Sequence, residues 1–135
     1  MITQDQLKAL QERVEALHRY LDVDNKRIEV EEEELRTHVP DFWNDQKAAE
    51  AQMKKIKMLH FWIDSCEEVS KAAEEVATGF DFVKEGLIEE ADVDALYAEA
   101  VDKVEKLELR NMLRRDEDKM DAIIKINSGA GGTES

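Results

Sequence analysis

The chain has 135 residues, enough for one domain with its own hydrophobic core. Its 33 acidic and 19 basic side chains give a formal net charge of −14, so its surface should on average repel nucleic acid. A single cysteine excludes an intrachain disulfide, and no apolar run approaches the roughly 20 residues of a membrane span, so we expect a cytoplasmic protein without signal peptide or membrane helix.

The amino-terminal segment predicts a coiled-coil-like helix. Thr3 and Gln6 have the spacing of a capping box, in which each side chain satisfies a backbone donor of the first turn. Apolar residues then recur at alternating spacings of three and four: Leu7, Leu10, Val14, Leu17 and Leu21. The polar segment from Asp22 to Asn25 interrupts this seam, so we expect a kink or a new helix start there.

A second helix should follow and end before a turn. Ile28 and Leu35 place one apolar line on this helix, whereas the acidic run 31–34 should mostly face water. Pro40 ends the helix, because proline pushes the preceding residue out of the helical region. Residues 40–45 then predict a structured turn with a polar side chain that caps the next helix.

The dominant element is a long helix from Gln46 to at least Ala77, which contains no helix breaker. Its apolar stripe comprises Met53, Ile56, Leu59, Trp62, Ile63, Cys66, Val69, Ala73 and Val76. At 1.5 Å per residue this helix would be roughly 45 to 50 Å long, which a compact domain of this size cannot surround. We therefore expect an elongated bundle, with a bend rather than a stop at Thr78-Gly79.

A last helix should begin with Asp92 as its cap and run to about Leu113, returning antiparallel along the long helix. After it, Ala122–Ile126 is short, rich in β-branched residues and followed by a glycine-rich segment, so it predicts one strand. A single strand is not stable alone, so we expect residues 1–115 to form a helical domain and 116–135 to begin a second, mixed domain.

The predicted fold class is therefore all-α, an elongated antiparallel helical bundle with coiled-coil-like packing, plus one short C-terminal β-strand segment.

Residues that could carry chemistry have structural explanations. The glycine cluster lacks the Lys-Ser/Thr pair of a P-loop. The Glu15–His18 spacing occurs once, whereas carboxylate-bridged metal bundles need two such motifs, and a pair such as His60 and Asp64 is more often a surface interaction. Cys66 lies in the apolar stripe, where cysteine acts as a small hydrophobe. We expect no catalytic site, metal, cofactor or small-molecule substrate.

Two basic clusters stand out in this acidic chain: Lys54, Lys55 and Lys57, and Arg110, Arg114 and Arg115. We favour a structural interpretation, in which the first is a solvated helix face and the second complements the dipole of a helix end. The alternative is that these patches contact RNA or another partner.

Residues 20–26 form a helix break, and residues 39–44 contain a proline-aspartate-x-tryptophan turn. This combination is similar to the helical domain of bacterial class I peptide chain release factors of the release factor 2 type. Residues 107–113 with 124–135 resemble the junction between the helical domain and the central mixed domain. The junction motif, which favours the release factor 2 type, is Gly131, Gly132, Thr133 and Glu134.

The resemblance implies a role in translation termination. Complete members recognise UAA and UGA in the ribosome and trigger peptidyl-tRNA hydrolysis, using a Ser-Pro-Phe tripeptide and a Gly-Gly-Gln loop that this sequence lacks. The chain alone should therefore be inactive in release. The implied partners are the large-subunit stalk base with its ribosomal protein L11 region, and the rest of the release factor chain. The six basic residues named above are then the candidates for ribosome binding.

Two other hypotheses remain open. A free-standing helical adaptor or coiled-coil dimerisation protein would explain the heptad seam, but it would have no use for a terminal strand. An exposed strand would pair with the same strand of another copy and give a homodimer. The second of these hypotheses is a metal-dependent or hydrolytic enzyme, which metal analysis of the purified chain would test.

Overall fold

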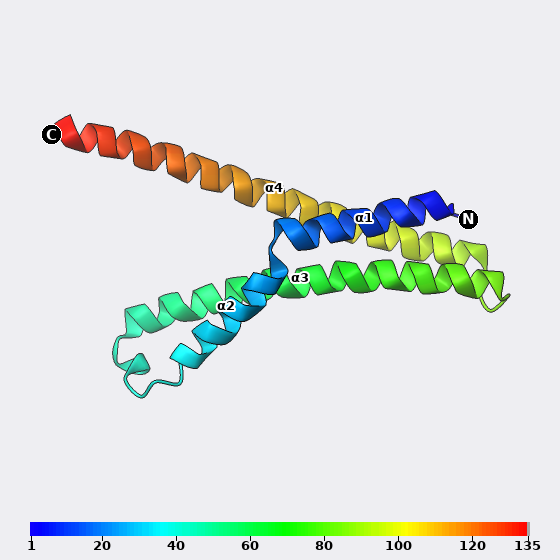
Figure 1. Cartoon of the computed structure of the whole chain (residues 1–135), viewed down its shortest axis with the longest axis horizontal. Helices are drawn as coiled ribbons and strands as arrows, with labels where there is room; N and C mark the ends of the chain where they lie inside the picture. Colours follow the sequence, from blue (N-terminus) through cyan, green and yellow to red (C-terminus); the bar gives the residue numbers. More distant parts are fainter. Residues whose placement is uncertain (135) are drawn as a thin grey trace.

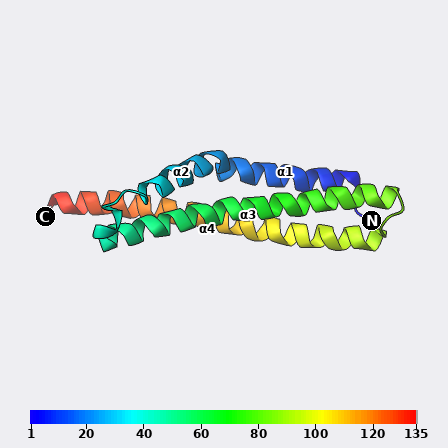
Figure 2. The ribbon, with the colours of Figure 1, turned by 90° about the horizontal axis from the view of Figure 1, so that it is seen from below.

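The computed structural model describes the backbone of residues 1–134 and the side chains of residues 1–121. Four α-helices and one turn of 3-10 helix follow in order: α1 (Gln4–Tyr20), α2 (Val23–Arg36), η1 (Phe42–Asn44), α3 (Gln46–Lys84) and α4 (Glu90–Glu134). Helices α3 and α4 form an antiparallel pair, with α1 beside the second half of α3 and α2 beside its first half (Figure 1). The view from below shows a long, narrow molecule (Figure 2), which confirms the predicted elongated bundle.

The predicted start and interruption of the first helix are confirmed. Thr3 and Gln6 form a reciprocal capping box, with N–O distances of 2.8 and 3.2 Å. Asp22 adopts a left-handed backbone conformation with φ of 51°, and the Asn25 side-chain amide donates to its carboxylate at 2.7 Å. Because an Asp tolerates this conformation better than most residues, the chain changes direction there and α2 begins at Val23.

Helix α3 is capped by Asp45, whose carboxylate accepts a hydrogen bond from the Ala48 backbone N–H at 3.1 Å. The helix then continues past the predicted bend to Lys84. Gly79 lies where α3 and α4 approach each other, because a Cβ atom at this position would be 3.2 Å from Cδ1 of Leu96. Its role is therefore close packing rather than a break.

The turn between α3 and α4 depends on Gly86, which has a φ of +75°. Helix α4 begins at Glu90, earlier than predicted. Asp92 does not precede the helix as its cap; from inside the first turn it accepts a hydrogen bond from the Glu89 backbone N–H at 3.1 Å. Asp92 therefore stabilises this end of α4 through its side chain, but the predicted start of the helix was too late in the sequence.

One continuous core runs along the bundle. Its most deeply buried side chains are Leu10, Leu21, Val23, Cys66, Val76, Val93 and Val104. Three predicted apolar positions are wrong: Ile28, Leu35 and Met53 are 55%, 61% and 43% exposed. Helix α2 packs on α3 along a narrow face that buries Val23 and Val30 instead, so the other side of α2 remains in water.

The predicted strand at Ala122–Ile126 is also wrong, because α4 continues as a helix through these positions. A strand needs a neighbouring strand to satisfy its backbone N–H and C=O groups, and the part of the chain that the structure describes contains none. A helix satisfies the same groups internally. Within the described residues, no helix is long and apolar enough to cross a membrane.

Candidate functional site

The basic–aromatic groove is a hollow of about 700 Å³ between α3 and α4. Its lining has four apolar residues, here called the floor: Met58, Phe61, Trp62 and Leu113. It also has four cations, here called the cationic rim, and one carboxylate: Lys54, Lys57, Arg110 and Arg114, with Glu117. Antiparallel packing of the two helices produces this hollow, because it brings residues near position 60 beside residues near position 110.

Two arginines of α4 lie over the two aromatic rings of α3. The guanidinium carbon of Arg110 is 5.1 Å from the centre of the Phe61 ring, and that of Arg114 is 5.5 Å from the centre of the Trp62 ring. The two rings meet edge to face with their centres 5.2 Å apart. These cation–π contacts hold the guanidinium groups in place, each contributing about 0.5 to 1 kcal/mol at a partly exposed site.

Further contacts hold Arg114 at the groove. Its Nη2 donates to Oδ1 of the buried Asn111 at 2.9 Å, while its Nε is buried and has no hydrogen-bond partner among the side chains of residues 1–121. Burial of the Lys26 ammonium lowers its pKa, and the positive charge of Arg114 lowers it further. The groove is therefore a local positive region in a chain of net charge −14.

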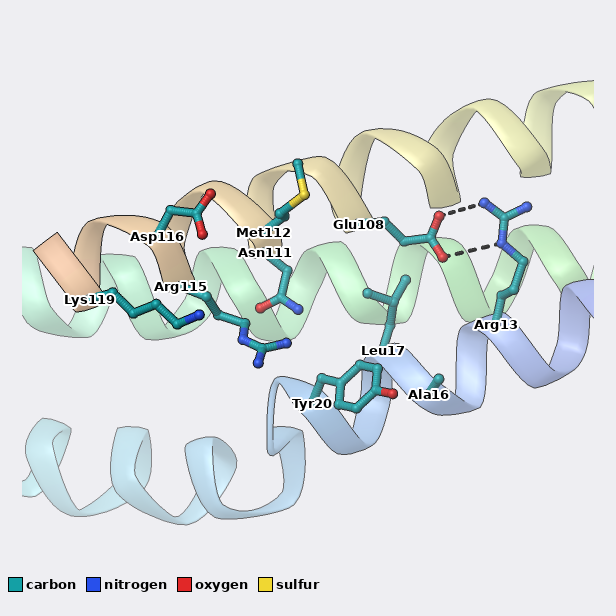
Figure 3. A pocket seen from close by; sticks show the side chains of 10 residues that line it. All are labelled: Arg13, Ala16, Leu17, Tyr20, Glu108, Asn111, Met112, Arg115, Asp116 and Lys119. Carbon is teal, nitrogen blue, oxygen red and sulfur yellow. Dashed lines mark hydrogen bonds and ion pairs between the residues drawn. The ribbon is translucent and has the colours of Figure 1, made fainter.

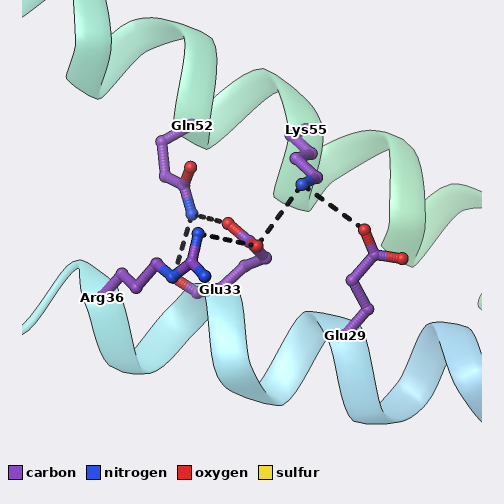
Figure 4. A network of polar contacts seen from close by, with 5 residues as sticks. All are labelled: Glu29, Glu33, Arg36, Gln52 and Lys55. Carbon is purple, nitrogen blue, oxygen red and sulfur yellow. Dashed lines mark hydrogen bonds and ion pairs between the residues drawn. The ribbon is translucent and has the colours of Figure 1, made fainter.

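A second polar arrangement joins α2 to α3 (Figure 4). Glu33 is only 4% exposed, and its carboxylate accepts hydrogen bonds from Gln52 and Lys55 and pairs with Arg36 at 3.2 Å. Lys55 Nζ lies 3.4 Å from both Glu33 and Glu29. The hydrogen bond from Gln52, then Lys55 and Arg36, lowers the pKa of Glu33 despite its burial. This cluster joins two helices, so Lys55 has a structural role.

A third feature is a cleft of about 380 Å³ between α1 and α4 (Figure 3). Arg115 and Lys119 line it beside Asp116 and Tyr20, with the Arg13–Glu108 ion pair at its other end. Three cations and two carboxylates line the cleft, and Arg13 is paired with Glu108, so its charge is more nearly balanced than that of the groove. Arg115 therefore lies apart from Arg114 although the two are adjacent in the sequence.

The structure divides the six predicted binding residues among three places. Four of them meet in the groove: Lys54, Lys57, Arg110 and Arg114. Lys55 lies in the Glu33 cluster and Arg115 in the α1–α4 cleft. The predicted motif residues lie outside the residues whose side chains are described: Gly131, Gly132, Thr133 and Glu134.

The sequence analysis correctly placed Trp62 in the core stripe, but it missed that Trp62 and its neighbour Phe61 also line this groove, because it did not consider Phe61. Met58 and Phe61 follow Lys54 and Lys57 on one face of α3, and Leu113 lies between Arg110 and Arg114 in the same way. This repeated mixture of basic and apolar residues at helical spacing was the signal in the sequence that could have predicted the groove.

The groups considered for chemistry are explained by packing. Nε2 of His60 lies 2.6 Å from Glu34 of α2, rather than pairing with Asp64 on its own helix. Cys66 is 1% exposed, and burial raises the pKa of its thiol. Among the side chains that the structure describes, no group of three His, Cys, Asp or Glu could hold a metal ion.

Comparisons with known proteins identify similar sequences along nearly the whole chain. The PCRF domain family matches residues 25–135. Peptide chain release factor 2 of Aeromonas hydrophila subsp. hydrophila is 34% identical over 137 aligned residues, which cover 97% of this chain. The chain spans 36% of the length of that relative.

Proposed function

The chain belongs to the PCRF domain family and is of the bacterial release factor 2 type, and from this premise we propose that it is the ribosome-contacting helical arm of a translation termination factor. The observation that carries the proposal is the match to release factor 2 along 97% of the chain. Since translation takes place in the cytoplasm, we propose that the arm acts there.

We propose that residues 1–115 are the helical domain and that residues 116–135 lead toward a central domain. The course of α4 supports this division. Its amino-terminal part packs along α3, whereas its C-terminal part projects away from the other helices (Figure 1). Stop-codon recognition at UAA and UGA and peptidyl-tRNA hydrolysis would then belong to other parts of the complete relatives. The sequence contains neither Ser-Pro-Phe nor Gly-Gly-Gln, so we infer that the chain alone does not release peptide.

The charge of the molecule supports a protein-rich contact region on the ribosome. With a net charge of −14, the arm would be attracted to basic ribosomal proteins and repelled by bare RNA. The stalk base of the large subunit, with its ribosomal protein L11 region, is the surface that the family resemblance implies. We propose that the four cations of the basic–aromatic groove form one local contact within this region.

The test is co-sedimentation of the purified chain with ribosomes through a sucrose cushion, followed by chemical cross-linking. We expect the chain to pellet with large subunits, with cross-links to stalk-base proteins. Replacing both Lys54 and Lys57 by Glu should weaken pelleting, whereas replacing Lys8 and Arg19, two exposed cations of α1, should have a smaller effect. A chain that stays in the supernatant would contradict the proposal, as would cross-links confined to the small subunit.

The competing proposal of a free-standing dimerisation protein has weaker support. Its weaker support rests on the comparisons, because the release factor 2 match extends along 97% of the chain. The predicted terminal strand no longer argues against an adaptor, since α4 is helical through Ala122–Ile126. For the same reason, a homodimer through paired C-terminal strands loses its basis. Sedimentation equilibrium of the chain alone separates the two proposals. A dimer that does not bind ribosomes would favour the adaptor.

A further inference from the structure

The basic–aromatic groove combines two properties that single out a class of ligand. Met58 and Leu113, at 57% and 52% exposure, give its floor an apolar surface open to solvent. Lys54 and Lys57 on one side, with Arg110 and Arg114 on the other, give it a cationic rim. A ligand that fills the groove must therefore cover apolar surface and supply negative charge at its flanks.

The aromatic rings do not favour a nucleobase as this ligand. Trp62 is only 8% exposed, and the guanidinium groups of Arg110 and Arg114 already lie over the two ring faces. A base stacked on these ring faces, the main apolar contribution in single-strand RNA binding, would therefore have to displace a guanidinium group. The phosphate backbone would meet the apolar floor, which offers it no hydrogen-bond donors.

The dimensions of the groove suit a helix. Phe61 lies seven positions after Lys54 in α3, roughly 10.5 Å along the helix axis, and Glu117 lies seven positions after Arg110 in α4, at the same separation. Positions i and i+7 of a helix lying in the groove are separated by this same distance, so its apolar residues at i, i+3, i+4 and i+7 would follow the floor. Carboxylates beside that stripe would face the cationic rim.

We propose that the groove binds an acidic amphipathic helix of a partner protein, with apolar side chains on Met58 and Leu113 and carboxylates paired to the four cations. The proposal rests on the proposed function, because it states the chemistry of one protein surface that the arm meets there. Trp62 and Asn111 already hold the guanidinium of Arg114 in place. Pairing with a carboxylate of the partner therefore immobilises this side chain little further, which reduces the entropic cost of binding.

A direct binding experiment tests this proposal without ribosomes, so its failure would leave the co-sedimentation result standing. The probe is a fluorescein-labelled 18-residue helical peptide with Leu at the i, i+3, i+4 and i+7 positions of one face and Glu at the flanking positions. The measurement is its anisotropy on titration with the whole chain at low and high salt. We expect saturable binding that weakens about tenfold or more as salt rises.

Variants then locate the binding. Lys54→Glu with Lys57→Glu should weaken binding about tenfold or more, since both side chains are exposed and neither supports the core. Leu113→Asp should weaken binding to the same extent, because it places a charge on the apolar floor of the groove. The matched control, Lys8→Glu with Arg19→Glu, makes the same charge change on α1 and should leave binding within about twofold. Circular dichroism of each variant checks that the helices remain folded.

Three control ligands test whether the groove binds an acidic amphipathic helix or a different ligand. A peptide with Gln in place of Glu, and one of the same composition with its apolar stripe scrambled, should each bind at least about tenfold more weakly. Failure of the acidic peptide to bind, or equal binding of the scrambled peptide, would overturn the proposal. Tighter binding of a single-stranded RNA of equal charge would overturn it in favour of RNA. Self-association of the chain abolished by Leu113→Asp would overturn it in favour of a second copy.

Discussion

Arg13 of α1 and Glu108 of α4, 95 residues apart in the sequence, form a two-point ion pair with N–O distances of 2.5 and 3.2 Å (Figure 3). The hydrogen bond from Arg13 to Glu108 raises the pKa of the guanidinium, although partial burial opposes this effect. Because the planar guanidinium and the carboxylate match at two points, the pair fixes the first helix against the last one in a single register.

The coupling between these two side chains should be measurable but modest. Both are more than a third exposed, so solvent screening limits the coupling free energy in a double-mutant cycle to about 1 kcal/mol or less. The cycle compares Arg13→Ala, Glu108→Ala and the double variant by urea unfolding. The exposed Asp102–Lys106 pair within α4 is the control and should couple by about 0.3 to 0.5 kcal/mol. A coupling at Arg13–Glu108 no larger than this control would show that the pair does not fix the helices.

The buried Glu33 carboxylate should make the stability of the α2–α3 contact depend on pH. Its folded-state pKa is lowered, so its contribution is present above the unfolded pKa of about 4.3 and is lost as pH falls through the folded value. Glu33→Gln should therefore lower the Tm at pH 7, and the difference from the original chain should shrink below about pH 4. Glu32→Gln, at an exposed neighbour, should show no such difference. A Tm difference that does not change with pH would contradict the assigned role of the Glu33 charge.

The burial of a leucine in the core should determine how much its replacement by alanine lowers the free energy of unfolding. Leu10 is 1% exposed, so Leu10→Ala should lower the free energy of unfolding by about 2 to 5 kcal/mol. Leu35 is 61% exposed, and Leu35→Ala should change it by less than about 0.5 kcal/mol. Urea unfolding followed by circular dichroism measures both values. Similar costs at the two positions would mean that α1 does not pack in the described register.

The Cys66 thiol should be unreactive while the bundle is folded. It is buried in the core, and burial raises its pKa, so little thiolate forms at neutral pH. An aromatic disulfide reagent should react with the native chain at least about a hundredfold more slowly than with the chain in denaturant, because reaction requires opening of the helices. Rapid reaction under native conditions would contradict this. Cys66→Ser removes the thiol and controls for nonspecific signal.

The sequence by itself determined most of the secondary structure, because the determinants are local. The capping box at Thr3, the interruption at Asp22 and the long apolar stripe that includes Val69 and Val76 all act within a few residues of the chain. The resemblance to release factors likewise depended on short segments. Local periodicity failed at Ile28 and Leu35, where the apolar residues exist but no neighbouring helix covers them.

The tertiary structure alone decided which distant residues meet. Lys54, Lys55 and Lys57 are nearly adjacent in the sequence, yet the packing of α2 directs Lys55 to Glu33, while the return of α4 places Arg110 and Arg114 over Phe61 and Trp62. It also decided the outcome at Ala122–Ile126, where β-propensity is a weak preference that depends on a partner strand. The physical reason is that helical hydrogen bonds are satisfied within one segment, whereas grooves, ion pairs between helices and sheets require two segments in a fixed register.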